Sequence, residues 1–388
     1  SGNVGIGYYA LRVVTTGAGN VVLGQYAGDS VTSGGDNVII GNVAGATMTS
    51  TTNTVLIGRS AGTAINSTDA NGTVAIGYTA GQSITSGAAN TVIGYESGKA
   101  LTTGGSNISL GYQAHLALVS GDNNVAIGVN AADAMAVGES ENIAIGTSAL
   151  GGMDEGTAGG DIDGNIAIGH AALVGGDLAG NDRQVQDNIA IGRNSLNSTS
   201  DNAQTGTIAI GKDALTALTS GAGNTAIGYL AMATSTVNHS NVAIGYAAMR
   251  YSNGSESQNV AIGYEAGTSM DNNDSSKSIL IGYRAGKGGT GEIDRCVVIG
   301  DGAMDGTGAV GAQQNIFIGN DAGGGTWTTA ASNSNVAIGA TAMADALNGA
   351  LGNTALGHDT LKALTSGDYN VAVGHNAGST VTTGGGNT

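Results

Sequence analysis

Acidic side chains crowd into the two longest repeats of the sequence, and they are the residues best suited to hold a cation. Asp161-Ile162-Asp163-Gly164 follows half of a calcium-loop pattern, with hard carboxylate ligands placed around a glycine turn. The closing bidentate glutamate is missing at its expected offset. We therefore favour solvated acidic loops and no bound cofactor, and we expect any calcium site at Asp154, Glu155, Asp161 and Asp163.

Two of the five histidines, His358 and His375, occupy the same position in successive repeats. If one repeat makes one turn of a stacked structure, the two imidazoles lie about 4.8 Å apart. That spacing brings both rings within reach of one metal ion, but the usual third and fourth ligands have no obvious source. We therefore interpret the pair as part of a surface ladder.

Tyrosines recur directly after a glycine in several repeats. Stacked tyrosines can bind the faces of sugar rings, which would make the chain a glycan-binding module. The interpretation we favour is that they pack between repeats and shield the glycine. These residues are Tyr78, Tyr95, Tyr112, Tyr229, Tyr246, Tyr264 and Tyr283.

Catalytic constellations are absent from the sequence pattern. No nucleophile, general base or carboxylate pair recurs with a spacing that would bring it to a common site, so the sequence predicts no enzyme. Cys296 is the single cysteine, which excludes a disulfide within one chain. We favour a packed free thiol over a bridge between two chains.

The element that carries all these residues is a short, mostly apolar motif closed by glycine and repeated 21 times in 388 residues. Most copies begin with asparagine, as at Asn165, Asn188 and Asn241, and successive copies begin 17 to 23 residues apart. Such self-similarity is typical of arrays in which each copy buries its apolar face against its neighbours. We expect one continuous array over residues 1–388, with no separate domains.

We interpret each copy as one coil of an all-β, parallel β-solenoid of about 21 coils. The copy at residues 73–87 opens with a β-branched strand that is too short for a helix and is stopped by Gly77. The closing glycine is invariant, as at Gly169 and Gly245, which indicates a backbone corner with positive φ or a close approach. Asparagines stacked in successive coils can form a hydrogen-bonded ladder, so we expect them to be structural.

The strand of each copy presents two faces. The second and fourth residues, such as Ile76 and Ile191, are large and branched, and we expect them to form the core. The third residue, such as Ala75 or Ala243, points to the opposite face and is apolar in nearly every copy. We therefore expect both faces to be buried, as in a parallel sheet covered on both sides.

The face of the third residues needs a cover. An apolar stripe along about 20 coils would exceed the few hundred Å² that soluble monomers leave exposed. Copies of the same chain, in register, would cover it at every level, and alanines allow their close approach. The alternative is that the second segment of each coil folds over this face within one chain.

Composition and charge narrow the partners further. The chain is 40% hydrophobic but only 4% aromatic, so its core must be built from many small side chains. A net charge of −17 repels phosphate backbones and anionic membrane surfaces, so no nucleic-acid partner is expected. No apolar run approaches the roughly 20 residues of a membrane helix, so we expect no membrane insertion by this segment, which we take to belong to a longer protein.

The motif Asn-Val-Ala-Ile-Gly at residues 241–245, 259–263 and 335–339 resembles the head repeat of trimeric autotransporter adhesins of the YadA type. The stretch Tyr264-Glu265-Ala266-Gly267 is similar to the longer repeat of phage tail-fibre proteins. The similarity covers nearly the entire chain. It implies a left-handed parallel β-roll, generally a homotrimer, that serves as an extracellular stalk or adhesive head.

These features together predict a structural fibre or stalk segment, extracellular or on a virion tail fibre, that projects loops for attachment. The alternative is an adhesin module that binds a cell-surface glycan or receptor through the tyrosine rows or the loops at residues 142–187. A third hypothesis is ice binding through threonine rows such as Thr15-Thr16 and Thr102-Thr103, but these rows lapse between Asn124 and Gly206.

Overall fold

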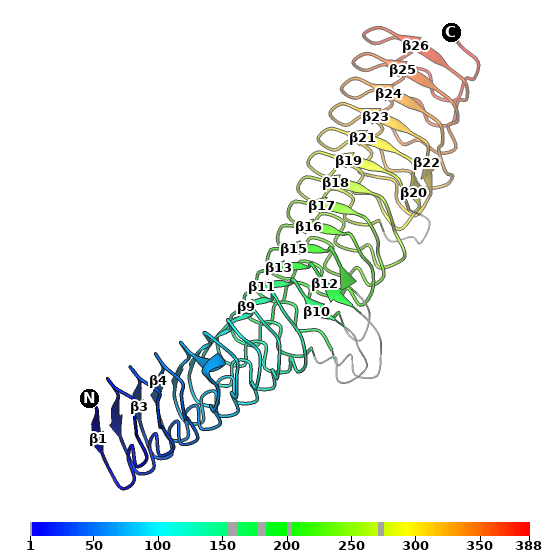
Figure 1. The fold of residues 1–388 in the computed structure, drawn as a ribbon. Coiled ribbons are helices and arrows are strands. Elements are labelled where there is room, and N and C mark those ends of the chain that lie inside the picture. The colour runs from blue at the N-terminus through cyan, green and yellow to red at the C-terminus, as the bar shows by residue number, and fades with distance from the viewer. Residues whose placement is uncertain (1, 154–160, 177–183, 200–203, 271–274) are drawn as a thin grey trace. The chain divides into compact units, whose positions relative to one another are not determined.

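The computed structural model describes residues 2–153, 161–176, 184–199, 204–270 and 275–388. It is an all-β parallel β-solenoid, which confirms the predicted fold class (Figure 1). Within the described residues the helical content is one turn of 3-10 helix, η1 (Thr68–Ala70). The chain divides into two compact units, residues 1–194 with 198–204, and residues 195–197 with 205–388. Each is described separately below.

In unit 1, every coil contributes one three-residue main strand, and each main strand pairs in parallel with the next (Figure 1). The register is unshifted, so that Val74 lies beside Thr91 and Ala167 beside Ala190. The main strands are β1 (Val4–Ile6), β2 (Val21–Leu23), β3 (Val38–Ile40), β4 (Val55–Ile57), β5 (Val74–Ile76), β6 (Thr91–Ile93), β7 (Ile108–Leu110), β8 (Val125–Ile127), β9 (Ile143–Ile145), β11 (Ile166–Ile168) and β13 (Ile189–Ile191).

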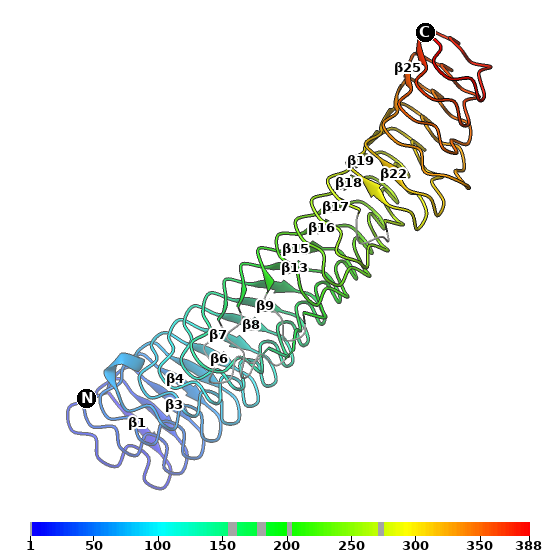
Figure 2. The same cartoon turned by 90° about the vertical axis from the view of Figure 1, so that its right-hand side faces the viewer.

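Unit 2 repeats the same arrangement, with every described main strand parallel to the next and in the same register (Figure 2). Ala226 lies beside Ala243, for example. The main strands are β15 (Ile208–Ile210), β16 (Thr225–Ile227), β17 (Val242–Ile244), β18 (Val260–Ile262), β19 (Ile279–Ile281), β21 (Val297–Ile299), β23 (Ile316–Ile318), β24 (Val336–Ile338), β25 (Thr354–Leu356) and β26 (Val371–Val373).

Some coils add a second, two-residue strand just before the next main strand. In unit 1, β10 (Ile162–Asp163) pairs with β12 (Val185–Gln186), and in unit 2, β20 (Ile293–Asp294) pairs with β22 (Ala312–Gln313). A further short strand, β14 (Gln204–Thr205), spans the boundary of the two units. Figure 1 shows β12 and β22 on a different side of the coils from the main strands of their own units.

The invariant glycine after each main strand satisfies both predicted requirements. Its φ is positive, with values of 140° at Gly77, 133° at Gly169 and 136° at Gly245, in a region that other residues rarely adopt. A Cβ added to Gly169 would also lie 2.6 Å from the carbonyl oxygen of Gly192 in the next coil. The corner therefore admits only glycine, because successive coils approach backbone to backbone there.

The predicted asparagine ladder is present, and its side chains are buried. The Asn188 backbone N–H donates to Asn165 Oδ1 in the preceding coil at 3.1 Å. Asn165 Nδ2 in turn donates to the Val185 carbonyl of its own coil at 2.6 Å. Asn241 makes the same two kinds of bond, accepting from the Asn259 N–H at 2.9 Å and donating to the Glu256 carbonyl at 2.8 Å. Each asparagine thus closes its own coil and ties it to the next.

Several of the residues that replace asparagine keep the coil-closing bond. Ser278 Oγ donates to the Ile293 carbonyl at 3.1 Å, and Cys296 Sγ donates to the Ala312 carbonyl at 3.2 Å. Cys296 is a buried free thiol, as predicted, and burial raises its pKa to about 11. A thiol with that pKa is protonated at neutral pH and unreactive, so its role is the same as that of the asparagines.

The two faces of the main strand are opposite to our expectation. The third residue, such as Ala75 or Ala243, is buried inside the coil in every copy from β2 to β25. The second and fourth residues, which we expected in the core, point outward, and Ile76 and Ile191 are only partly buried. Alternation identifies two faces but not which one is inside. Each three-residue strand directs only its middle side chain inward, whatever its size, and the two flanking side chains outward.

Two of the core positions compensate each other in size. These are the middle residue of the main strand and the residue six places later, which has a left-handed backbone. In most coils one of them is large and the other small. Large middle residues pair with glycine in Leu56 and Gly62, Val92 and Gly98, Leu280 and Gly286, and Phe317 and Gly323, whereas alanine pairs with a large residue in Ala144 and Leu150, Ala209 and Leu215, and Ala243 and Met249.

Direct contacts explain this compensation. A Cβ on Gly286 would lie 2.6 Å from Leu280 Cδ2, and one on Gly62 would lie 2.8 Å from Leu56 Cδ2. Both side chains therefore occupy the same volume. Because interiors are closely packed, a large side chain at one of these two positions disfavours a large side chain at the other.

Exchanging the two sizes within one coil should test this rule. We expect Leu280→Ala to destabilise its coil by about 2–5 kcal/mol, because the cavity left behind cannot collapse. Adding Gly286→Leu should recover part of the loss, since Leu215 already has this left-handed conformation, with φ 49°. Amide hydrogen exchange of residues 279–300 measures the local effect.

The matched control is Ile279→Ala, which truncates an outward residue of the same strand and should cost less than Leu280→Ala. If the double variant exchanged faster than Leu280→Ala alone, the two positions would not share one volume.

Candidate functional site

The outward residues of the main strands form a row of partly exposed apolar side chains. We define the Val/Ile stripe as the first and third residues of every main strand. Many of its members are well exposed, including Val21 and Leu23 at 43% and Ile108 and Leu110 at 41% in unit 1, and Ile279 at 39% in unit 2. Because each strand is in register with the next, the stripe is continuous within each unit. An ordered row of exposed apolar side chains marks a binding surface.

The composition of the stripe sets it apart from the rest of the chain. Its only polar members are Thr91, Thr225 and Thr354, and it holds none of the 29 acidic and 12 basic residues. A strand face that met water would carry charges, especially in a chain with net charge −17. The face that our sequence analysis placed in the core is therefore the face that needs a cover.

The tyrosines form flat stacks, as expected for packing between coils. In unit 1, Tyr78, Tyr95 and Tyr112 have ring centroids 5.1 and 5.3 Å apart with interplanar angles of 15° and 7°. In unit 2, Tyr246 and Tyr264 are 4.9 Å apart, with an angle of 7°. The ring faces thus cover one another, which leaves edges and hydroxyl groups as the surface a glycan would meet.

A cation lies over an end ring of each stack. The Arg59 guanidinium lies 5.9 Å from the centroid of Tyr78, and the Arg284 guanidinium lies 5.5 Å from the centroid of Tyr283. Stacking of a sugar on either of these two rings would have to displace a cation–π contact. Glycan binding by the rows stays a prediction, and this geometry does not favour the stacking mode.

The acidic residues proposed for calcium are only partly brought together. Asp161 and Asp163 line a small hollow of about 60 Å³ that also includes Glu139. Burial raises the pKa of Asp163, and the neighbouring carboxylates of Asp161, Glu141 and Asp187 raise it further, whereas the Ser140 N–H lowers it. A calcium ion would reverse the effect of the carboxylates. Asp154 and Glu155 lie outside the described residues, so the calcium site stays a prediction.

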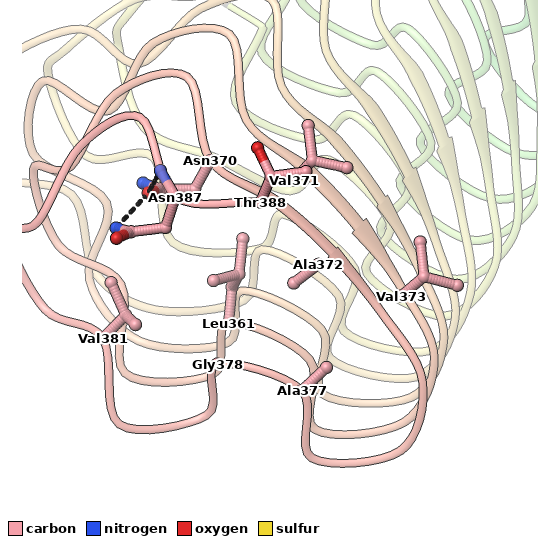
Figure 3. Close-up of a pocket in the computed structure, with 10 residues that line it drawn as sticks. All are labelled: Leu361, Asn370, Val371, Ala372, Val373, Ala377, Gly378, Val381, Asn387 and Thr388. Atoms are coloured by element: carbon pink, nitrogen blue, oxygen red, sulfur yellow. Dashed lines mark hydrogen bonds between the residues drawn. The ribbon is translucent and has the colours of Figure 1, made fainter.

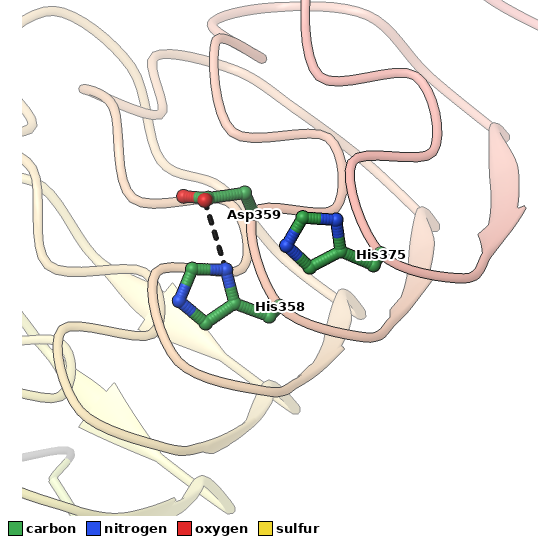
Figure 4. Close-up of side chains that lie close together, drawn as sticks. All are labelled: His358, Asp359 and His375. Carbon is green, nitrogen blue, oxygen red and sulfur yellow. Dashed lines mark ion pairs between the residues drawn. The ribbon is translucent and has the colours of Figure 1, made fainter.

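The histidine pair stacks as the spacing predicted. His358 and His375 have ring centroids 5.3 Å apart and an interplanar angle of 17°. Sequence reasoning missed Asp359, whose carboxylate lies 2.8 Å from His358 Nδ1 (Figure 4). Across the described part of the chain, these three residues are the one group whose potential metal-ligating atoms all lie within 4.8 Å of one another. No repeat pattern marked Asp359, because it contacts His358 as the next residue in the chain and not as a residue at the same position of another coil.

A second polar pair that the sequence did not reveal lies inside unit 1. Ser109 Oγ and His115 Nδ1 are 2.8 Å apart, and both residues are fully buried. They occupy the two core positions that elsewhere hold a large and a small residue, so the pair replaces an apolar contact by a hydrogen bond. A serine beside a histidine suggests nucleophilic chemistry, but a substrate could not reach a pair with no exposed surface.

A hollow lined mainly by apolar side chains lies at β26 and measures about 280 Å³. Figure 3 shows Leu361, Ala372 and Val381 lining it, with Asn387 bonded to Asn370 at its edge. In preceding coils the corresponding residues are covered by the next coil. The hollow is therefore the cross-section of the core at the last described coil.

In the described residues no helix has the length and apolarity needed to cross a bilayer.

No protein-family description matches the chain, and no curated protein sequence is significantly similar to it.

Acid should destabilise unit 1 through His115. Burial lowers the pKa of His115 from 6.5 to about 3, because the charged ring cannot be solvated there. Between these two pH values the unfolded chain binds a proton that the folded chain does not, so stability falls as the pH falls below about 6.5. The loss should be about 2 kcal/mol at pH 5.

The paired substitution Ser109→Ala and His115→Leu should remove this dependence, since it reproduces the apolar pair of Ala209 and Leu215. Urea unfolding between pH 5 and 8, followed by hydrogen exchange in residues 108–123, measures the difference. A His170→Leu variant, altered at an exposed histidine, is the control. Identical pH profiles for the paired variant and the unsubstituted chain would contradict the assignment.

Proposed function

We propose that this chain is a structural segment of an extracellular or virion-attached fibre, and that it self-associates through the Val/Ile stripe. The observation that carries the proposal is the continuous, uncharged and partly exposed stripe within each unit. The resemblance of the Asn-Val-Ala-Ile-Gly motif to adhesin heads and tail-fibre repeats supports a homotrimer as the assembly. Attachment to a cell surface or a receptor would then depend on loops carried by the fibre.

A second copy of the same chain suits this stripe for a geometric reason. The side chains recur once per coil, at the spacing of parallel strands, about 4.8 Å. A partner that contacts every coil needs the same repeat, and another copy in register has it by construction. Each chain carries a net charge of −17. Because the stripe contains no charged residue, two copies can pack along it without placing their acidic side chains against each other.

The magnitudes favour a long interface over a local one. Burying the exposed part of one Val or Ile contributes about 0.5–1.5 kcal/mol. Association costs about 4–15 kcal/mol in lost freedom of motion. A single coil therefore cannot hold two copies together, whereas a run of ten or more coils can. This dependence on length is the behaviour expected of a fibre.

Charges placed in the stripe should dissociate the assembly. The variant Ile227→Lys, Ile244→Lys and Ile262→Lys puts three cations on consecutive coils of unit 2. We expect the unsubstituted chain to be oligomeric and the variant to shift to monomer, with at least a hundredfold weaker association, because the lysines cannot be desolvated at that interface. Native mass spectrometry and sedimentation measure the number of chains.

The matched control is Ala222→Lys, His239→Lys and Ser257→Lys, which adds the same charges to the same region of unit 2 outside the stripe. It should remain assembled. A monomeric unsubstituted chain, or equal dissociation of both variants, would refute self-association through the stripe.

The binding-module alternative makes a different prediction. A pure shaft should give no signal on a glycan array, because the tyrosine faces already contact one another and nearby cations. Binding of a defined glycan that is lost in Tyr95→Ala, but retained in the stripe variant, would favour the adhesin module. The comparison of the two variants separates loss of a site from loss of assembly.

A further inference from the structure

We propose that His358, Asp359 and His375 form a binding site for a divalent transition-metal ion of the zinc or copper type. The site lies on unit 2 and is independent of the proposed fibre function. The two histidines supply imidazole nitrogens from successive coils, and Asp359 supplies a carboxylate oxygen (Figure 4). Imidazole combined with one carboxylate is a ligand set that these metals prefer.

The backbone holds the two histidines in place before any ion binds. Each follows its corner glycine, and Leu356 pairs with Val373 in the β25–β26 ladder immediately before those glycines. On the other side, the Asn376 N–H donates to the His358 carbonyl at 3.0 Å. Both Cα positions are thus fixed by hydrogen bonds between coils. Metal binding would order side chains only, which keeps its entropy cost small.

Asp359 is oriented by groups that leave one oxygen directed at His358. Its Oδ1 accepts bonds from Thr341 Oγ1 at 2.6 Å and Lys362 Nζ at 2.8 Å. Its Oδ2 lies 2.8 Å from His358 Nδ1. The hydrogen bonds from Lys362 and then Thr341 lower the pKa of Asp359 to about 2, so the carboxylate is ionised at neutral pH. It is a ready anionic ligand.

The separations suit coordination after a small adjustment of one ring. In a tetrahedral site, ligand atoms about 2.0–2.2 Å from a zinc ion lie about 3.3–3.6 Å from each other. The pair formed by His358 Nδ1 and Asp359 Oδ2, now 2.8 Å apart, would open slightly, and an ion there would replace the shared proton. His375 Nδ1 lies 2.9 Å from Asn376 Nδ2, so we assign Nε2 to the metal. In Figure 4 a ring nitrogen of His375 points to the side where Asp359 lies. Rotation of this exposed side chain would complete the approach.

The chain contains its own control for the effect of a single histidine. His170 is exposed and follows corner glycine Gly169, so it occupies the same position in its coil as His358. The residues at that position in the neighbouring coils are Thr147 and Arg193. His170 therefore has the same local backbone without a second histidine one coil away.

Isothermal titration of the metal-free full chain with Zn²⁺ and Cu²⁺ at neutral pH tests the proposal. We expect one site whose affinity follows the order Cu²⁺ over Zn²⁺. His358→Ala and His375→Ala should each weaken it at least tenfold, and Asp359→Asn at least threefold. His170→Ala should leave it unchanged. Ca²⁺ and Mg²⁺ at millimolar concentration should not compete, because they prefer all-oxygen ligands.

Electron paramagnetic resonance of the Cu²⁺ complex provides a second readout. The spectrum should show coupling to two histidine nitrogens, and to one in His375→Ala. Unchanged affinity in both histidine variants, an equal loss in His170→Ala, or displacement by Ca²⁺ would each overturn the proposal. If Asp359→Asn bound the metal with unchanged affinity, the Asp359 carboxylate would not be a ligand.

Discussion

The structure depends on one constraint, which is that the backbone of each coil packs directly against the backbone of the next at a constant distance between coils. The corner glycines express this most directly, since Gly169 has no room for a Cβ beneath the Gly192 carbonyl. At that spacing every inward polar group must find its partner within its own coil or one coil away. The asparagine side chain does both, because Oδ1 accepts a hydrogen bond from a backbone N–H of the next coil and Nδ2 donates one to a backbone carbonyl of its own coil. Leaving such a buried amide unpaired would cost about 1–3 kcal/mol. That cost explains why serine and cysteine, where they replace asparagine, keep a donor.

Because the distance between coils is constant, the core consists of compartments of similar volume, one in each coil. In most coils the compartment holds one large side chain, contributed by the main strand as in Leu280, or by the left-handed position as in Met249. A leucine or methionine with positive φ is strained by about 1–2 kcal/mol. Filling the compartment offsets that strain, and so the unfavourable conformation recurs in coil after coil. Ser109 and His115 satisfy the same volume requirement with polar atoms, which makes them sensitive to acid where the apolar pairs are not.

The sequence was sufficient to predict the parallel solenoid, the glycine corners and the asparagine ladder, because each follows from what recurs at one position. It was not sufficient to assign the inside of the strand. Ile76 and Ile191 are the residues that burial statistics place in a core, but the middle residue of each strand is the one directed inward, and in these two strands it is alanine. Contacts between different positions were equally hidden. Asp359 reaches His358 from the adjacent residue, and Ser109 reaches His115 across a corner, and neither relation produces a periodic signal.

One consequence of stacking is that a side chain on the surface is always beside its counterpart in the next coil. A residue type that continues through every main strand of a unit becomes a line, and one that occurs twice becomes a pair. The Val/Ile stripe is of the first kind, so the partner we assign to it must share the repeat. His358 and His375 are of the second kind, so the ligand we assign to them is a single ion. The tyrosines lie between these cases, in rows of three or four rings whose faces already contact one another. How far a column of like residues extends therefore decides the size of the partner it suits, and the chemistry of the residue decides its kind.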